Sequence, residues 1–154
     1  MAYVREGRPE EAGALTGLAL RSKAHWGYDE EFLAACRDEL TVTPDDTADG
    51  RTVVAEEDGR AGRVLGFTTL AGEPPEGSLA MMFVEPDAIG RGVGRLLFEH
   101  TVARARRSGF ARLTIDADPN AEAFYTAMGA VRIGSTPSGS VPGRRLPLLE
   151  LVLR

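Results

Sequence analysis

The spacing of hydrophobic residues divides the chain into short β-like runs and longer stretches with helical periodicity. Runs that alternate or are rich in β-branched residues predict strands at residues 2–6, 51–55, 64–70, 78–84, 113–117, 130–135 and 146–153. Apolar residues at helical spacing predict helices at about residues 9–22, 29–40, 93–108 and 118–129. The predicted order is βααβββαβαββ.

Local signals support these boundaries. Pro9 costs nothing at a first helical position, and Asp29 can cap the second helix. Gly109 can adopt the left-handed conformation that ends a helix. A glycine-containing loop at 58–62 joins two strands as an antiparallel meander, whereas the helix at 93–108 connects its strands as a βαβ unit. The fold class is therefore α/β with a mixed sheet.

Composition indicates an ordinary globular domain. The chain has 154 residues, of which 43% are hydrophobic and 27% charged, so we expect a single domain over residues 1–154. No apolar run approaches the roughly 20 residues that a membrane-spanning helix needs, and the N-terminus lacks the pattern of a signal peptide. We therefore expect neither export nor a membrane partner.

Charge and cysteine content further limit the classes of partner and metal that we expect. The net charge of −5 makes nucleic acid an unlikely principal partner. The single cysteine, Cys36, cannot form an intramolecular disulfide, and with only His25 and His100 there is no zinc-ligand spacing. These features predict a cytoplasmic protein without a structural metal.

The glycine-rich stretch at 89–95 carries the strongest chemical signal. Glycines let backbone N–H groups approach a ligand, and the helix that follows adds a partial positive charge, so the stretch can hold a phosphate without a lysine. The alternative is a plain connector. A Walker loop is excluded because Gly-Lys-Ser/Thr is absent. A dinucleotide fold could use Asp116 for a ribose, but the glycine spacing and the preceding meander argue against it.

A second motif lies at 118–129. In a purely structural interpretation, Pro119 starts a helix, Phe124 and Met128 pack one turn apart, Gly129 ends the helix, and Tyr125 is a surface phenol. The combination with the glycine-rich stretch favours a functional interpretation.

Together the two motifs closely resemble the GCN5-related N-acetyltransferase (GNAT) superfamily. The resemblance rests on Phe83-Val84-Glu85-Pro86, the stretch 89–97, Asn120-Ala121 and Phe124-Tyr125 with Met128-Gly129, and it is strong over residues 77–135. It implies a mostly antiparallel sheet that splays open around acetyl-CoA. Ile89 departs from the family pattern, which usually has Gln or Arg there, and Arg91 or Arg95 can supply the missing charge.

The resemblance also implies residue roles. The amides near Phe83 and Val84 would pair with the pantetheine arm, and Tyr125 would meet the sulfur as general acid. The remaining cofactor-binding residues would be Arg91, Gly92, Val93, Gly94, Arg95, Asn120 and Phe124. The base that accepts the proton of the amine is left open among Glu76, Asp116, Glu31 and His25.

The acceptor is expected to bind near the loop between the first two helices. That segment combines aromatic, acidic and imidazole side chains, and its candidate substrate-binding residues are His25, Trp26, Tyr28 and Glu31. Alternatively, Trp26 and Phe32 only anchor the core. In the last hairpin, Arg144 or Arg145 could meet a carboxylate, which hints at an amino-acid-like acceptor.

These observations predict an acetyl-CoA-dependent N-acetyltransferase that modifies a small-molecule amine. The alternatives are a non-catalytic CoA-binding regulatory module, acetylation of a protein N-terminus or lysine, and a nucleotide-binding protein. The oligomeric state is left open, a homodimer included.

Overall fold

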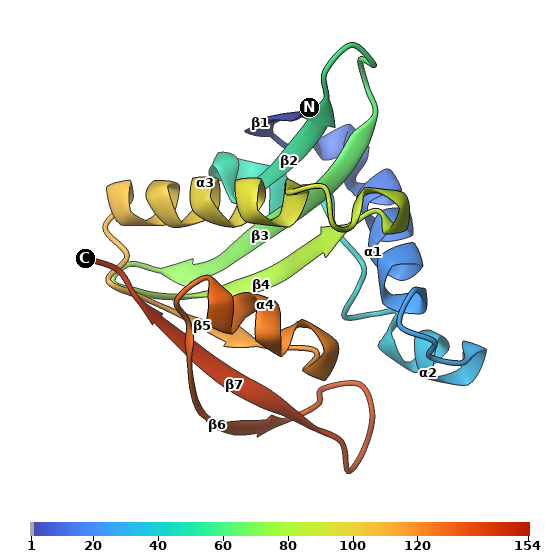
Figure 1. Ribbon diagram of the computed structural model, residues 1–154, viewed down its shortest axis with the longest axis vertical. Helices are drawn as coiled ribbons and strands as arrows, with labels where there is room; N and C mark the ends of the chain where they lie inside the picture. Colours follow the sequence, from blue (N-terminus) through green and yellow to red (C-terminus); the bar gives the residue numbers. More distant parts are fainter. Residues whose placement is uncertain (1) are drawn as a thin grey trace.

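The computed structural model describes residues 2–154, and its centre is one seven-stranded sheet in the order β1-β2-β3-β4-β5-β7-β6 (Figure 1). The strands are β1 Ala2–Glu6, β2 Thr52–Glu57, β3 Val64–Glu73, β4 Glu76–Val84, β5 Arg112–Asp116, β6 Val131–Pro137 and β7 Arg145–Val152. The helices are α1 Ala12–Ala24, α2 Glu30–Cys36, α3 Val93–Arg107 and α4 Glu122–Ala127.

The element order agrees with the prediction. Among residues 2–154, only the β4–β5 pair is parallel, as expected for a βαβ unit around α3, and the other strand pairs are antiparallel. The observed helices differ from the predicted ones at their ends. Pro9–Glu11 and Pro119–Ala121 form 3-10 turns ahead of α1 and α4, and α2 ends at Cys36, although Leu40 still packs in the same core.

Helices cover both faces of the sheet. Along β2, Val53 and Ala55 pack in the cluster that contains Leu97 of α3, whereas Val54 packs with Leu15 of α1. Successive side chains of a strand point to opposite faces, so α3 and α1 lie on opposite sides. Phe98 of α3 packs against Phe124 and Tyr125 of α4, and Figure 1 shows α2 at the end of α1.

Strands β4 and β5 are joined at one end only. They pair through Glu76–Ser78 and Arg112–Thr114, and β5 continues along β7 while β4 continues along β3. Within residues 2–154, the edge of β4 from Leu79 to Val84 therefore has no strand on its β5 side. This divergence opens the sheet directly before the glycine-rich stretch.

Helix α2 depends on its N-terminal cap. As predicted, Asp29 caps the helix, and its Oδ1 accepts a hydrogen bond of 2.8 Å from the backbone N–H of Phe32. A helix this short cannot form alone, so its cap and its packing on α1 must hold it.

Asp29→Ala is expected to lower the free energy of unfolding by about 1 kcal/mol because one backbone N–H of α2 loses its acceptor. Urea unfolding followed by circular dichroism measures the change. Asp29→Asn keeps a side-chain oxygen at the same place and should remain within a few tenths of a kcal/mol of the parent. Equal losses in both variants would contradict the capping role.

Candidate active site

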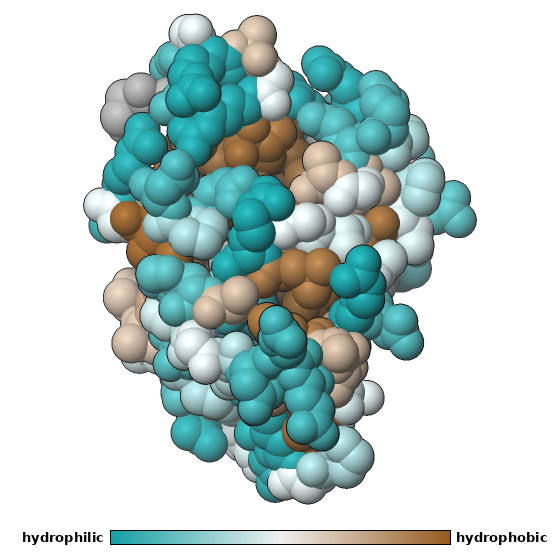
Figure 2. Space-filling view, turned by 90° about the vertical axis from the view of Figure 1, so that its right-hand side faces the viewer, coloured by the Kyte–Doolittle hydropathy of each residue, from teal (hydrophilic) through white to brown (hydrophobic). Residues whose placement is uncertain are grey.

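A cavity of about 680 Å³ lies where β4 and β5 diverge. Its lining residues come from the ends of α1 and β5, from β4, the glycine-rich stretch, α4 and the β6–β7 loop. Figure 2 views the molecule from the side of α1 and α2, and hydrophobic residues are visible between hydrophilic ones near the middle of this face. The volume falls within the range of small-molecule sites.

The glycine-rich stretch forms one end of the cavity. Gly90 and Gly92 have positive φ angles of 85° and 82°, and Gly92 is the N-cap of α3. A Cβ on Gly92 would meet no atom within 4 Å, so the loop backbone is open to a ligand. Among residues 2–154, the amides of Val93, Gly94 and Arg95 donate no hydrogen bond to a backbone carbonyl, because they form the first turn of α3. Unpaired amides at the positive end of a 15-residue helix make an anion site.

The predicted cofactor side chains divide into two groups. Seven residues line the cavity: Phe83, Val84, Gly92, Gly94, Arg95, Asn120 and Phe124. The side chains of Arg91 and Val93 lie elsewhere. Arg91 approaches Glu57 at 3.4 Å, and Val93 is buried in the core. These two residues can therefore contribute their backbone amides to the cavity end, which is the role that the resemblance implied.

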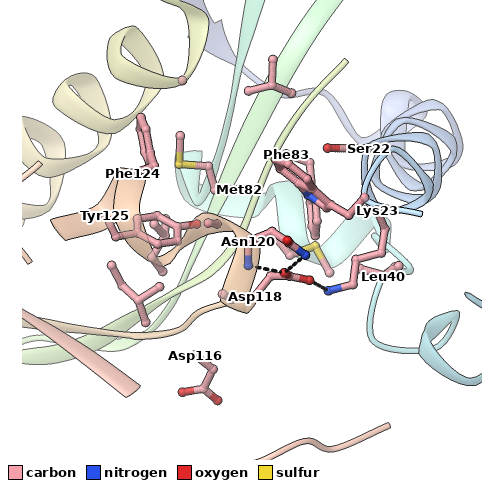
Figure 3. A pocket seen from close by; sticks show the side chains of 18 of the residues that line it. Ser22, Lys23, Leu40, Met82, Phe83, Asp116, Asp118, Asn120, Phe124 and Tyr125 are labelled. Atoms are coloured by element: carbon pink, nitrogen blue, oxygen red, sulfur yellow. Dashed lines mark hydrogen bonds and ion pairs between the residues drawn. The ribbon is translucent and has the colours of Figure 1, made fainter. Parts of the chain in front are cut away.

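Tyr125 is a buried phenol that reaches the cavity. Its side chain is only 7% exposed and its ring packs against Phe98 and Phe124, so it is not a surface residue. Its hydroxyl makes no hydrogen bond within residues 2–154, yet it is not a buried unsatisfied group, and in Figure 3 it points into the cavity. Burial, followed by the charge of Asp118, raises the pKa of Tyr125, so the hydroxyl stays protonated at neutral pH.

Asp118 is the centre of a polar network that sequence reasoning missed. Its Oδ2 lies 2.5 Å from Nζ of Lys23, and both side chains are only 12% exposed (Figure 3). Its Oδ1 accepts hydrogen bonds from the backbone N–H and the side-chain amide of Asn120, at 2.8 and 2.9 Å. Burial raises the pKa of Asp118, but these contacts lower it more, so the pKa lies below its ordinary value. In the sequence, Asp118 was visible only as a residue before a helix-starting proline.

Tyr28 links this network to the β6–β7 loop. Its hydroxyl donates to Oδ2 of Asp118 at 2.9 Å and accepts from the guanidinium of Arg144 at 2.8 Å. The guanidinium also lies 4.7 Å from the centre of the Phe32 ring. Arg145 bonds to Ser135 instead. Neither arginine lines the cavity, so the geometry does not support the amino-acid-like acceptor expected from the sequence.

The other predicted substrate residues are only partly brought together. Trp26 lines the cavity and is 42% exposed, which rules out the alternative that it anchors the core. His25 packs edge-on against Trp26 and is exposed, and Glu31 is exposed on α2. His25, Tyr28 and Glu31 are not among the lining residues, because the turn after α1 directs only Trp26 toward the cavity mouth.

The four candidate bases lie in different parts of the structure. Glu76 lies at the joined end of β4 and β5, where it pairs with Arg112 at 3.5 Å. Of the four candidates, only Asp116 lines the cavity, and within residues 2–154 it makes no side-chain hydrogen bond or ion pair.

The described residues contain neither a group of metal ligands nor a membrane-spanning helix. Over residues 2–154, no three His, Cys, Asp or Glu side chains are grouped so that they could hold a metal ion. No helix within that range is long and apolar enough to cross a membrane.

Comparison with known proteins identifies the family. The model of the acetyltransferase (GNAT) family matches residues 18–130, and the chain therefore belongs to this family. Its sequence is 31% identical over 88 residues to the peptidyl-lysine N-acetyltransferase YjaB of Salmonella typhimurium, a match that covers 57% of this chain and 56% of that protein.

Solved structures agree on the fold. A GCN5-related N-acetyltransferase from Rhodopseudomonas palustris is 27% identical with a TM-score of 0.76, over 99% of this chain and 96% of that one. The PaiA N-acetyltransferase from Thermoplasma acidophilum, solved with coenzyme A, is 15% identical with a TM-score of 0.78, over 99% of both chains. The mixed α/β fold predicted from the sequence is confirmed.

Asp118→Asn should destabilise the protein by about 1–3 kcal/mol at neutral pH, because Lys23 then keeps a largely buried charge without its counter-ion. The pKa of Asp118 is lower in the folded than in the unfolded protein. The contact therefore stabilises the fold above about pH 4, and its contribution is lost as the pH falls through the folded value. The difference in the free energy of unfolding between Asp118→Asn and the parent protein should therefore shrink as the pH falls over the same range.

Chemical denaturation between pH 3 and 7 measures this difference. Glu73→Gln removes a carboxylate from the exposed ion pair with Arg51 and is the matched control, expected to cost at most about 0.5 kcal/mol. A pH-independent loss in Asp118→Asn would show that its charge is not what matters.

Proposed function

We propose that the protein is an N-acetyltransferase that transfers the acetyl group of acetyl-CoA to a small-molecule amine. One observation carries the proposal: the open edge of β4 leads directly to the unpaired amides at the start of α3. An extended amide-containing arm can pair with the strand edge, while a pyrophosphate meets the helix N-terminus. The coenzyme A in the complex of the Thermoplasma relative supports the same ligand.

The cofactor-binding residues follow from this placement. Backbone groups near Phe83 and Val84 would hold the pantetheine arm, and the amides of residues 91–95 would hold the pyrophosphate, with Arg95 adding charge. Met82 and Phe124 border the same passage beside Gly94, since a Cβ on Gly94 would lie 3.4 Å from each of them. Asn120 borders the same space, although its amide is engaged by Asp118.

The chain offers an acid and a base for the transfer. The amine nitrogen bonds to the thioester carbonyl carbon, the C–S bond breaks, and the departing sulfur takes the proton of the Tyr125 hydroxyl. The carboxylate of Asp116 accepts the proton that the amine loses. The buried, protonated phenol and the free carboxylate line the same cavity, which supports these roles.

The β6–β7 loop favours a small acceptor. Val141 of this loop packs against the core of α1 and α2, and Arg144 stacks on Phe32, so the loop crosses to α2 and narrows the acceptor end. The lysine side chain of a protein is the second candidate, because the Salmonella relative is named as a peptidyl-lysine N-acetyltransferase. A free, buried Cys36 suits a reducing compartment such as the cytoplasm.

At about 100 times its dissociation constant, acetyl-CoA should stabilise the protein by roughly 2.7 kcal/mol. For a chain of this size that corresponds to a rise in Tm of about 5–10 °C. Gly92→Val should abolish the rise, because a branched side chain would cover the amides that meet the pyrophosphate.

Gly59→Val is the matched control for Gly92→Val. Gly59 has a φ of 79° and open space around a Cβ, so the substitution introduces the same backbone strain in the β2–β3 hairpin. The control should keep the full acetyl-CoA response. An undiminished rise in Gly92→Val would refute the pyrophosphate assignment.

Tyr125→Phe should leave acetyl-CoA affinity within about twofold and reduce kcat by about 10²–10⁴-fold, because the phenol acts only as the sulfur departs. The ring and its packing remain, and no hydrogen bond is lost, so Tm should not change. Release of free thiol measures the rate. Tyr3→Phe in β1 removes a phenolic hydroxyl that donates to Glu56 outside the cavity, and it should leave kcat unchanged. A decrease in kcat below about threefold would make Tyr125 a packing residue. Absence of thiol release from the parent with every amine would instead favour a CoA-binding regulatory module.

A further inference from the structure

The acceptor end of the cavity has an excess of carboxylates. Its charged lining side chains are Lys23, Glu39, Asp116 and Asp118. Lys23 and Asp118 neutralise each other through their 2.5 Å ion pair. Within residues 2–154, neither Glu39 nor Asp116 takes part in a side-chain hydrogen bond or an ion pair. Two negative charges are therefore available to a ligand at this end.

Glu39 lies close to the loop opposite it. The space in front of the Cα of Gly139 is occupied by Oε1 of Glu39, so the carboxylate of this exposed side chain lies beside the loop backbone. Glu39 follows α2 and Gly139 follows β6, and both line the cavity. The carboxylate therefore lies where these two segments border the acceptor end.

Ser22 gives an independent indication that a polar ligand group enters here. The residue is 7% exposed, and its hydroxyl forms no hydrogen bond within residues 2–154. In Figure 3 the hydroxyl points from α1 into the cavity. Within residues 2–154, no side-chain polar atom is both fully buried and without a partner, so the Ser22 hydroxyl is open to the cavity, where a ligand can supply a donor or an acceptor.

The remaining walls of this end are apolar. They consist of Trp26, Leu40, Met81, Phe83, Pro137 and Leu146. Carboxylates set among aliphatic and aromatic side chains suit a cation with an apolar stem, since the stem replaces water along the walls and the charge meets the carboxylates.

We infer that the acceptor is a cationic amine with an apolar stem and without a carboxylate near the reacting nitrogen, and that Glu39 and Asp116 enforce this choice. The inference rests on the proposed acetyl transfer and names its substrate class. An α-carboxylate would be placed beside like charges, and Arg144 would not offset them because Tyr28 and Phe32 engage its guanidinium. The same chemistry is offered by a free amine and by a lysine side chain.

Matched acceptors test the inference. Tyramine and tyrosine differ only by the α-carboxylate, and cadaverine and 5-aminopentanoate differ in one terminal charge. Within each pair, kcat/KM for the compound without the carboxylate, tyramine or cadaverine, should exceed that of its partner by at least about 30-fold. This ratio should fall with added salt. A lysine amide acetylated at its α-nitrogen separates the two sources: efficient use of it points to protein lysines, and its rejection points to free amines.

Glu39→Gln should lower both ratios at least about fivefold while leaving the KM of acetyl-CoA within about twofold. Glu30→Gln is the control, because it removes one exposed carboxylate from α2 outside the cavity and should leave the ratios unchanged. Equal use of amines and their carboxylate partners, or unchanged ratios in Glu39→Gln, would overturn the inference while acetyl transfer itself stands.

Calorimetry separates the inference from the proposed function. If no acceptor leads to release of thiol, titrations of tyramine and tyrosine into the CoA-loaded protein test the acceptor class by binding alone. Selective binding of tyramine would uphold the acceptor class although the transfer reaction had failed. Equal binding of both compounds, or binding of neither, would refute the acceptor class as well.

Discussion

The architecture of the site depends on the single-ended pairing of β4 with β5. Three residue pairs join the strands, and beyond Ser78 the two strands follow different partners. Backbone groups without partners are tolerated only where water or a ligand can reach them, so the divergence requires an accessible cleft. Residues Met82 and Phe124 meet near Gly94 on the α3 side of the sheet and close the cleft laterally. The same break thereby supplies the strand edge, the cavity and the approach to the helix N-terminus.

The Asp118 network fixes the width of this opening. It connects Lys23 at the end of α1, Tyr28 in the following loop, Asn120 before α4 and Arg144 before β7. No sheet pairing crosses the cleft at this level, so side chains hold the two halves together. Because Lys23 and Asp118 are both largely buried, loss of either charge would leave the other uncompensated, and the network behaves as a unit.

The sequence predicted the elements better than it predicted the contacts. Alternation, helical periodicity and glycine positions are local properties, and they located every strand and the glycine-rich turn that starts α3. The importance of Lys23 and Asp118 depends on a contact across 95 positions that no local pattern encodes. Similarly, residues 25–31 looked like one acidic and aromatic pocket, but the turn after α1 and the start of α2 point their side chains in different directions. Trp26 lines the cavity, whereas Glu31 is exposed on α2 and does not line it.

The two ends of the cavity obtain opposite charges from different sources. At the glycine-rich end the positive potential comes from backbone amides and the α3 dipole. Because these backbone groups do not titrate, their contribution to anion binding should vary little with pH. At the acceptor end the negative potential comes from the carboxylates of Glu39 and Asp116. Between them the Tyr125 phenol lies in a buried environment that keeps it neutral. In the reaction proposed above, a positive amine and a negative pyrophosphate would bind at opposite ends, and the Tyr125 phenol would lie between them, where the acetyl group would be transferred.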